Sequence, residues 1–137
     1  MSALTQPAAS SLAGATTARQ GRLLEICNRM ARLHKQAFGR GPTKCRALFA
    51  DHQSLVVILE KTLTVSERNL LAMGELARLH ESRIFAQSTL EHEARTIIEE
   101  VLQRRTLAFI TGLDPRRDMT LHFFTLAPDQ TTAQEPP

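Results

Sequence analysis

The sequence contains no tryptophan and no tyrosine, and only two of its 137 residues are cysteine. Cys27 and Cys45 lack the close spacing of a metal site and fall in different predicted elements, which favours small buried side chains in a reducing compartment over a disulfide framework. The longest apolar run, residues 55–59, is far shorter than the roughly 18 residues of a membrane-spanning helix. Residues 1–17 hold neither a charged side chain nor an apolar core, which argues against a signal peptide. We therefore expect a cytoplasmic protein.

Acidic side chains are scarce near the start of the chain, where Glu25 is the only acid among the first 50 residues. The net charge of the whole chain is only +3, so the excess of basic charge is concentrated in this part. Apolar residues at helical spacing predict a first helix from about Thr17 to Phe38. Its remaining faces are basic and carry Arg19, Arg22, Arg29, Arg32 and Lys35, with Arg40 just beyond. Such a surface suits an acidic partner or an anionic membrane, although a basic outer face is usually a solvated one.

Alternating apolar and polar residues predict two β-hairpins. The first joins strands at residues 44–50 and 54–61 through a turn at 51–53, and the second joins strands at 106–113 and 119–126 through a turn at 114–118. The unbroken apolar run inside the second strand is typical of a central strand that is buried on both faces.

A long second helix is predicted between the hairpins, from about Val65 to Arg104. Thr64 and Glu67 have the spacing of a capping box at its start. Forty helical residues would span about 60 Å, twice the diameter of a small domain. The helix must therefore break near residues 82–89 or extend onto a second subunit, and we favour the second subunit and a homodimer.

The predicted fold class is α+β, in the order helix–hairpin–helix–hairpin, with a four-stranded, mainly antiparallel sheet packed on two helices, the second of them long. Residues 17–127 form the one predicted domain. The segments at residues 1–16 and 128–137 have few apolar side chains to bury, so they are predicted to be disordered tails.

A glycine-rich corner links the first helix to the first strand and consists of Phe38, Gly39, Arg40, Gly41, Pro42, Thr43 and Lys44. Its two glycines allow the positive φ that a helix end favours, and its proline cannot continue a helix. Two cations are more than a helix end requires. We predict a structural junction at Gly39, Gly41, Pro42 and Thr43, and a contact with an anion or an acidic partner at Arg40 and Lys44.

The sequence shows no pattern typical of catalysis. Its five histidines are spread over separate elements, and His92, although it lies between two glutamates, does not share a helix face with them. His122 lies on the same strand face as Phe124 and is interpreted as packed or solvated at the sheet surface. The glycine corner follows a helix, the reverse of a phosphate-binding loop, and no nucleophile motif is present. We predict no enzyme, no catalytic residue, no metal site and no cofactor.

Two motifs resemble the hallmarks of one family. Residues 36–44 (QAFGRGPTK) are similar to its helix-to-strand junction, and residues 63–68 (LTVSER) are similar to its L-T-x-x-E-R helix start. The family is the MpsC-like family, the small soluble component of a sodium-translocating membrane-potential-generating system of bacteria. The resemblance covers about residues 20–127. It weakens beyond Met73, where Gly74 and Glu75 are retained and residues 79–91 diverge.

The resemblance implies a cytoplasmic accessory subunit that works with an antiporter-like membrane subunit and a large soluble partner at the inner face of the membrane. It implies a role in cation-coupled energisation or in inorganic-carbon uptake. The alternative, based on the basic helix and the corner alone, is a regulatory module that binds nucleic acid or another anion. Nucleic acid is the less favoured ligand because the sequence offers no aromatic stacking platform and no tight helix-turn-helix.

Overall fold

The structure is a computed structural model that describes residues 2–129, with side chains at residue 14 and from residue 16 onward. Its described residues have the predicted α+β class. The helices are α1 (Ser2–Phe38), α2 (Val65–Ala72), α3 (Leu76–Ser88) and α4 (Glu91–Leu102). The strands are β1 (Lys44–Asp51), β2 (Ser54–Glu60), β3 (Thr106–Asp114) and β4 (Met119–Leu126).

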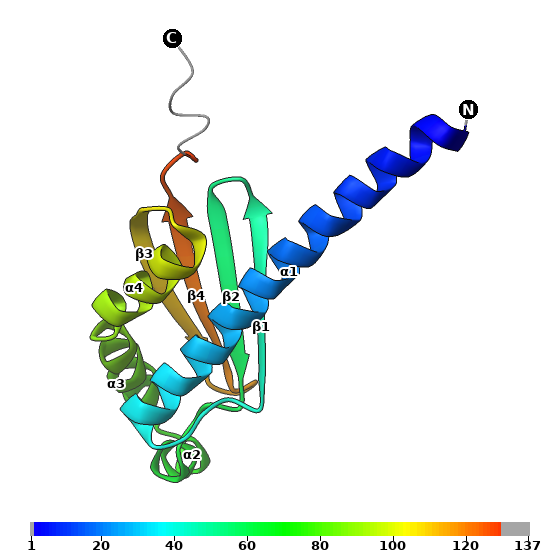
Figure 1. The fold of residues 1–137 in the computed structure, drawn as a ribbon. Helices are drawn as coiled ribbons and strands as arrows, with labels where there is room; N and C mark the ends of the chain where they lie inside the picture. Colours follow the sequence, from blue (N-terminus) through cyan, green and yellow to red (C-terminus); the bar gives the residue numbers. More distant parts are fainter. Residues whose placement is uncertain (1, 130–137) are drawn as a thin grey trace.

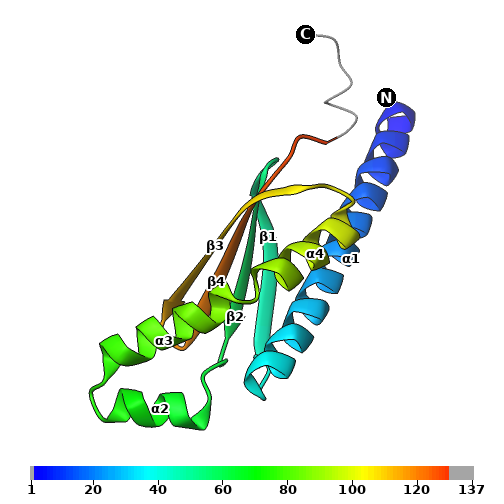
Figure 2. The same cartoon turned by 90° about the vertical axis from the view of Figure 1, so that its left-hand side faces the viewer.

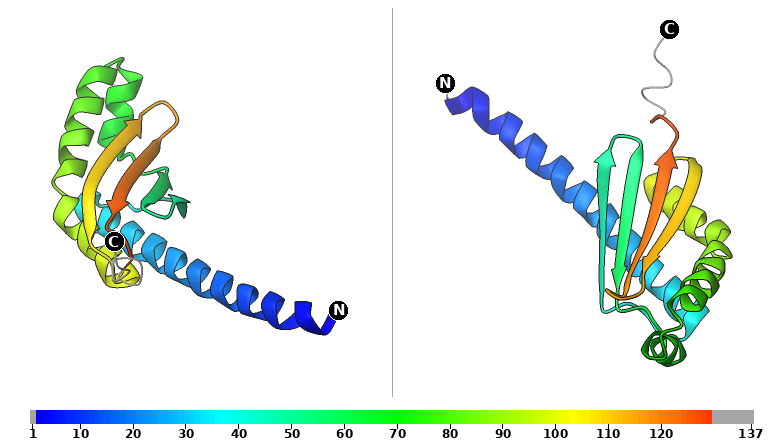
Figure 3. Two further views of the ribbon diagram at one scale, coloured as in Figure 1. Left: turned by 90° about the horizontal axis from the view of Figure 1, so that it is seen from above. Right: turned by 180° about the vertical axis from the view of Figure 1, so that it is seen from behind.

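The four strands form one antiparallel sheet in the order β1-β2-β4-β3. Both predicted hairpins are confirmed, and they join at the centre of the sheet, where Ser54 pairs with Thr125 and Glu60 with Met119. Helices α1, α3 and α4 lie on one face of this sheet, and α2 packs beside α3 (Figures 1 and 2). Seen from behind, the strands stand in front of the helices (Figure 3, right). The domain therefore has two layers, a helical one and a bare sheet.

The apolar core lies between the sheet and the helical layer. Leu55, Val57 and Leu59 alternate along β2 and are fully buried. They pack with Ile26 of α1 and Ile98 of α4, among others. The predicted apolar stripe of the first helix and the central position of β2 are thus confirmed.

The predicted burial of residues 55–59 on both faces is wrong. Val56 and Ile58 point away from the helices and are only half-buried. No described helix covers this second face, so the apolar run contributes one row to the core and one row to an open surface (Figure 3, right).

The single long second helix is also wrong, because residues 65–102 form three helices. The predicted capping box does open α2: Glu67 donates its N–H to Thr64 Oγ1 at 3.2 Å, and Thr64 donates its N–H to Glu67 Oε1 at 2.9 Å. Gly74, with φ +79°, then ends this helix. The N–H groups of Gly74 and Glu75 bond the carbonyls of Leu71 and Leu70, which closes the helix end and reverses the chain.

A second break separates α3 from α4 at Thr89 and Leu90. The hydroxyls of Ser88 and Thr89 donate to the carbonyls of Ile84 and Ala86 at 2.8 and 2.6 Å, and such local bonds compete with helix continuation. Each helix is now short enough for one domain. Helix length therefore no longer supports the predicted homodimer, which stays a prediction.

Helix α1 begins at Ser2, earlier than the predicted start near Thr17. Its N-terminal part extends beyond the sheet (Figure 1). The disordered tails stay a prediction: the backbone of residues 2–16 is helical in the structure, and residues 130–137 lie outside the described part of the chain.

Candidate functional site

The predicted corner ends α1 and leads into β1. Gly39 has φ +76°, and its N–H donates to the carbonyl of Lys35 at 2.8 Å, which closes the helix as predicted. Gly41 does not have a positive φ, so of the two glycines only Gly39 uses this freedom. Pro42 is half-buried, and exposed Thr43 donates its N–H to the carbonyl of Glu60 at 3.0 Å, which starts the pairing of β1 with β2.

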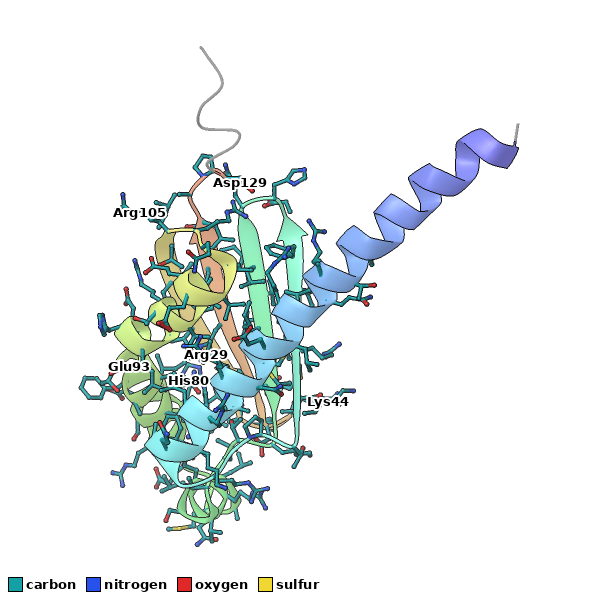
Figure 4. The ribbon with its side chains drawn as sticks, viewed as in Figure 1. Arg29, Lys44, His80, Glu93, Arg105 and Asp129 are labelled. Carbon is teal, nitrogen blue, oxygen red and sulfur yellow. The ribbon has the colours of Figure 1, made fainter. Side chains whose placement is uncertain are left out.

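The two cations of the corner have different surroundings. Arg40 is half-buried and donates from Nε to the carbonyl of Lys61 at 3.4 Å, which ties the corner to the end of β2. Lys44 is exposed and points outward from the β1 side of the molecule (Figure 4). Neither has a salt-bridge partner among residues 2–129. The contact of these two residues with an anion or an acidic partner stays a prediction.

Helix α1 carries further cations that face solvent. Arg22, Arg32 and Lys35 are exposed and have no salt-bridge partner in the described part of the chain, whereas Arg29 pairs with Glu100 of α4. We call Arg22, Arg32 and Lys35 the basic α1 surface. A groove of about 390 Å³ between α1 and α4 adjoins it and is lined by Arg29, Arg32, Leu33, Gln36, His92, Glu93, Thr96 and Ile97.

A larger cleft of about 1120 Å³ lies between α1, the β1–β2 turn and the end of α4. Arg19, Arg22 and Arg104 line it together with the acids Asp51 and Asp129. The carbonyls at the C-terminus of α4 add negative partial charge. The cleft therefore has mixed charge and does not by itself select an anion.

Polar side chains also form a cluster inside the protein, between the C-terminal end of α1, helix α3 and the sheet. We call it the polar cluster, and its fully buried members are His34, Thr62, Arg83, Gln87, Thr120 and His122. Buried polar groups of this kind cost stability unless they are hydrogen-bonded. Gln87 meets this demand at the centre: its Oε1 accepts from Arg83 Nε at 3.0 Å and from Thr120 Oγ1 at 3.1 Å, and its Nε2 donates to Thr111 Oγ1 at 2.6 Å.

Two histidines connect α1 to the sheet within this cluster. The Nε2 atoms of His34 and His122 lie 2.8 Å apart, and Nδ1 of His122 lies 3.0 Å from Thr111 Oγ1. A bond between two Nε2 atoms needs one protonated and one unprotonated nitrogen, so the two rings are opposite tautomers. In either arrangement Nδ1 of His34 has no partner among the described residues.

Both rings are held in the neutral form. Burial, reinforced by the charge of Arg83, lowers the pKa of His34 to about 3. Burial lowers the pKa of His122 well below its usual value, with further contributions from His34 and Arg83. The pair therefore joins α1 to β4 by hydrogen bonding and not by charge.

Arg83 is the charged member of the polar cluster. Its Nη1 donates to Glu67 Oε1 at 3.1 Å and its Nη2 to the carbonyl of Thr62 at 3.2 Å. Its guanidinium also lies 3.6 Å from the centre of the Phe38 ring, at the end of α1. The same Glu67 oxygen caps α2, so Arg83 links α1, α2, α3 and the end of β2.

The two cysteines, predicted to be free buried side chains, lie on neighbouring elements as free thiols. Cys27 is buried and Cys45 half-buried. Their hydrogen bond lowers the pKa of Cys27, and the same bond together with burial raises the pKa of Cys45. The contact holds α1 against β1 near the core.

The sequence did not predict the polar cluster. His34 and His122 were treated as scattered histidines; His122 was expected to be packed or solvated at the sheet surface, and it is packed and completely buried. A signal existed in the helical spacing: His34 is four residues from both Met30 and Phe38 of the apolar stripe, and Leu79, Arg83 and Gln87 repeat every four residues. This spacing places the polar side chains on the buried faces of α1 and α3.

The described residues contain no group of three or more metal-ligating side chains close enough to hold an ion. Within residues 2–129, none of the helices is both long enough and apolar enough to cross a membrane. The fold and these surfaces define a small two-layer α+β protein with a basic helix locked to its sheet by buried polar bonds.

Comparison with known families identifies the family of the chain. The family described as Na+-translocating membrane potential-generating system (MpsC) matches residues 19–128. The chain belongs to the MpsC family, as the two sequence motifs predicted. No curated protein and no solved structure matches the chain significantly.

Proposed function

We propose that this chain is a non-enzymatic docking subunit of the Na+-translocating system named in its family description. It binds an acidic surface of its partners through the basic α1 surface and the corner cations Arg40 and Lys44. By resemblance to the family, the partners are an antiporter-like membrane subunit and a large soluble protein, and the process is cation-coupled energisation or inorganic-carbon uptake. The subunit would act in the cytoplasm, at the inner face of the membrane.

The observation that carries this proposal is the excess of exposed cations on α1, in which Glu25 is the only acid. Arg22, Arg32 and Lys35 have no salt-bridge partner among the described residues, and the polar cluster fixes the end of their helix. Because the helix backbone is already ordered, binding orders only the side chains themselves, at about 0.5–1.5 kcal/mol each. Near an anionic leaflet each cation adds about 1 kcal/mol of attraction, and this falls off within a Debye length of about 8 Å.

Co-purification with the membrane subunits tests the proposal. The tagged full chain is expressed with its membrane partners, and the complex is isolated at low and at high salt. We expect the complex at low salt and its loss at high salt. Replacing Arg40 and Lys44 with Gln should weaken the complex at low salt by about tenfold while leaving the melting temperature nearly unchanged, because Lys44 is exposed and half-buried Arg40 makes one long hydrogen bond of 3.4 Å.

Arg116 and Arg117 provide the matched control. Both are exposed at the turn between β3 and β4, so replacing both with Gln removes the same charge from another surface. This control variant should bind normally. Equal loss of binding in both double variants would show a general charge effect and overturn the proposed surface. Binding to nucleic acid without any complex with the membrane subunits would instead support the alternative function.

A further inference from the structure

The bare face of the sheet carries an ordered pattern of side chains. Cross-strand pairing places Leu48, Val56, Phe123 and Ile110 in one apolar row across all four strands. The neighbouring row consists of Arg46, Ile58, Leu121 and Gly112, and the row at the end of the sheet consists of Lys44, Glu60, Met119 and Asp114. Ile110 is 60% exposed, Leu48 40% and Leu121 39%. Exposed apolar groups contiguous over a whole sheet mark an interaction surface.

The charged residues on this face are Lys44 and Arg46 on β1, Asp114 on β3, and Glu60 on β2 opposite Lys44. The β1 edge carries the cations Lys44 and Arg46, and the β3 edge carries Asp114 at the same end of the sheet. A two-fold rotation about an axis parallel to the strands places β1 of one copy over β3 of the other. Each row of one copy then lies over the same row of the second copy. Leu48 then meets the Ile110 position of the second copy, and the cationic edge meets the acidic edge.

Gly112 adds a complementary detail of shape. A Cβ placed on this residue would meet no atom within 4 Å, so the sheet surface is open above it. In the rotated pair this opening faces Arg46, whose stem can lie over the glycine while its guanidinium reaches Asp114. A face that is complementary to itself in both shape and charge fits a second copy of the same chain.

We propose that the bare sheet face is the interface of a homodimer, with two sheets packed face to face and β1 of each copy over β3 of the other. Four strands at about 4.8 Å spacing and seven residues at about 3.4 Å give a face of roughly 20 by 25 Å. Two such faces bury about 1,000 Å², the lower limit of a specific interface. We expect a weak dimer, with a dissociation constant in the range of about 1–100 µM, because an interface near the lower limit leaves little surplus over the cost of association.

Sedimentation of the full chain over a concentration series tests the dimer. Ile110→Asp places a charge in the apolar row and should weaken dimerisation by about 100-fold or more. Phe85→Asp is the matched control, because Phe85 is 73% exposed on α3, in the helical layer on the other side of the sheet. It should leave the dimer unchanged. A chain that stays monomeric at about 100 µM, or equal loss in both variants, overturns the proposal.

A double-mutant cycle tests the orientation. Arg46→Gln and Asp114→Asn should each weaken the dimer by about tenfold, and the double variant should be no weaker than the weaker single variant, because both changes break one contact. Asn at residue 114 keeps the oxygen that accepts the N–H groups of Arg116 and Arg117, so the turn stays folded. The cycle uses Arg46 and not Lys44, because Lys44 is also proposed to contact the membrane partners. A change at Arg46 therefore tests the dimer without changing that contact. Additive losses of about 100-fold would overturn the β1-over-β3 arrangement.

Discussion

His34 and His122 share a single hydrogen bond between their Nε2 atoms, 2.8 Å apart, although 88 residues separate them in the sequence. The bond joins the C-terminal end of α1 to β4 inside the protein. It exists only while at least one of the two Nε2 atoms is unprotonated, because a proton on each Nε2 would leave no acceptor. The attachment of the basic helix to the sheet thus depends on the protonation of two side chains.

The first prediction follows from this pair and concerns pH. Both histidines have a pKa below 6.5 in the folded protein, about 3 for His34, whereas in the unfolded chain the pKa is about 6.5. Below pH 6.5 the unfolded chain takes up protons that the folded protein does not, so stability is present above pH 6.5 and is lost as the pH falls towards 3. From pH 7 to pH 5 the unfolding free energy should drop by about 2 kcal/mol because of His34, and His122 should add to this drop.

Urea unfolding at several pH values measures this dependence. His122→Asn should lower stability at pH 7 but reduce its slope between pH 7 and pH 5, because one titrating group is gone. His52→Asn, at an exposed histidine of the β1–β2 turn, should leave the slope unchanged. An unaltered slope in His122→Asn would show that the buried pair does not control the pH dependence.

The second prediction concerns Arg83. Replacing it with Met should destabilise the fold by about 3 kcal/mol, because Glu67 and the carbonyl of Thr62 lose a charged donor and Phe38 loses its stacked cation. Arg78→Met, at an exposed position of the same helix, should change stability by less than about 0.5 kcal/mol. Chemical denaturation of both variants gives the comparison. Similar small effects in the two variants would show that Arg83 contributes little.

The third prediction separates the two glycines of the corner. Gly39→Ala should cost about 1–2 kcal/mol, because φ +76° is unfavourable for any residue with a Cβ. Gly41→Ala should be nearly neutral: its φ is not positive, and the new Cβ would lie 3.4 Å from the carbonyl oxygen of Ala31, an ordinary contact. Melting curves of the two variants decide the matter. A larger loss at Gly41 would contradict the described corner.

The fourth prediction concerns Asp118, a buried residue with φ +53°. Its Oδ1 accepts the N–H groups of Thr62 at 2.9 Å and Leu63 at 3.1 Å, which fixes the segment after β2. Asp118→Ala leaves both donors unsatisfied and should cost about 2–4 kcal/mol. Asp118→Asn keeps an acceptor and tolerates the left-handed backbone, so it should cost less than about 1 kcal/mol. Denaturant unfolding measures the stability of both variants. An equal loss of stability in Asp118→Ala and Asp118→Asn would show that the Oδ1 acceptor does not stabilise the fold.

The sequence predicted the local features of this fold and lost accuracy where distant segments meet. The capping box at Thr64 and Glu67 depends on neighbouring residues, and both hairpins depend on short turns, so these were visible in the sequence. The break at Gly74 also had a local signal, since a glycine inside a helix costs about 1 kcal/mol relative to alanine. The break at Thr89 had a weaker one, because hydroxyl groups are common within helices.

The polar cluster lay beyond reach for a different reason. Helical spacing placed His34 among apolar residues of α1, but it did not show that His122 of β4 would lie opposite. Likewise, the sequence did not distinguish Arg83 from the other arginines, because its partner Glu67 lies 16 residues away on α2. The corner cations Arg40 and Lys44 could be proposed as contact residues from the sequence, because that proposal rests on their positions beside Gly39 and Gly41 and not on distant segments.

The order of the strands has a consequence for how the chain acquires its structure during synthesis. The centre of the sheet pairs Ser54 with Thr125, 71 residues apart, whereas each hairpin closes over a short turn. The hairpins can form early, but closing the large loop between β2 and β4 carries the greater entropic cost. On the ribosome, β1 and β2 must wait for β4, and their apolar residues are meanwhile open to association with other chains.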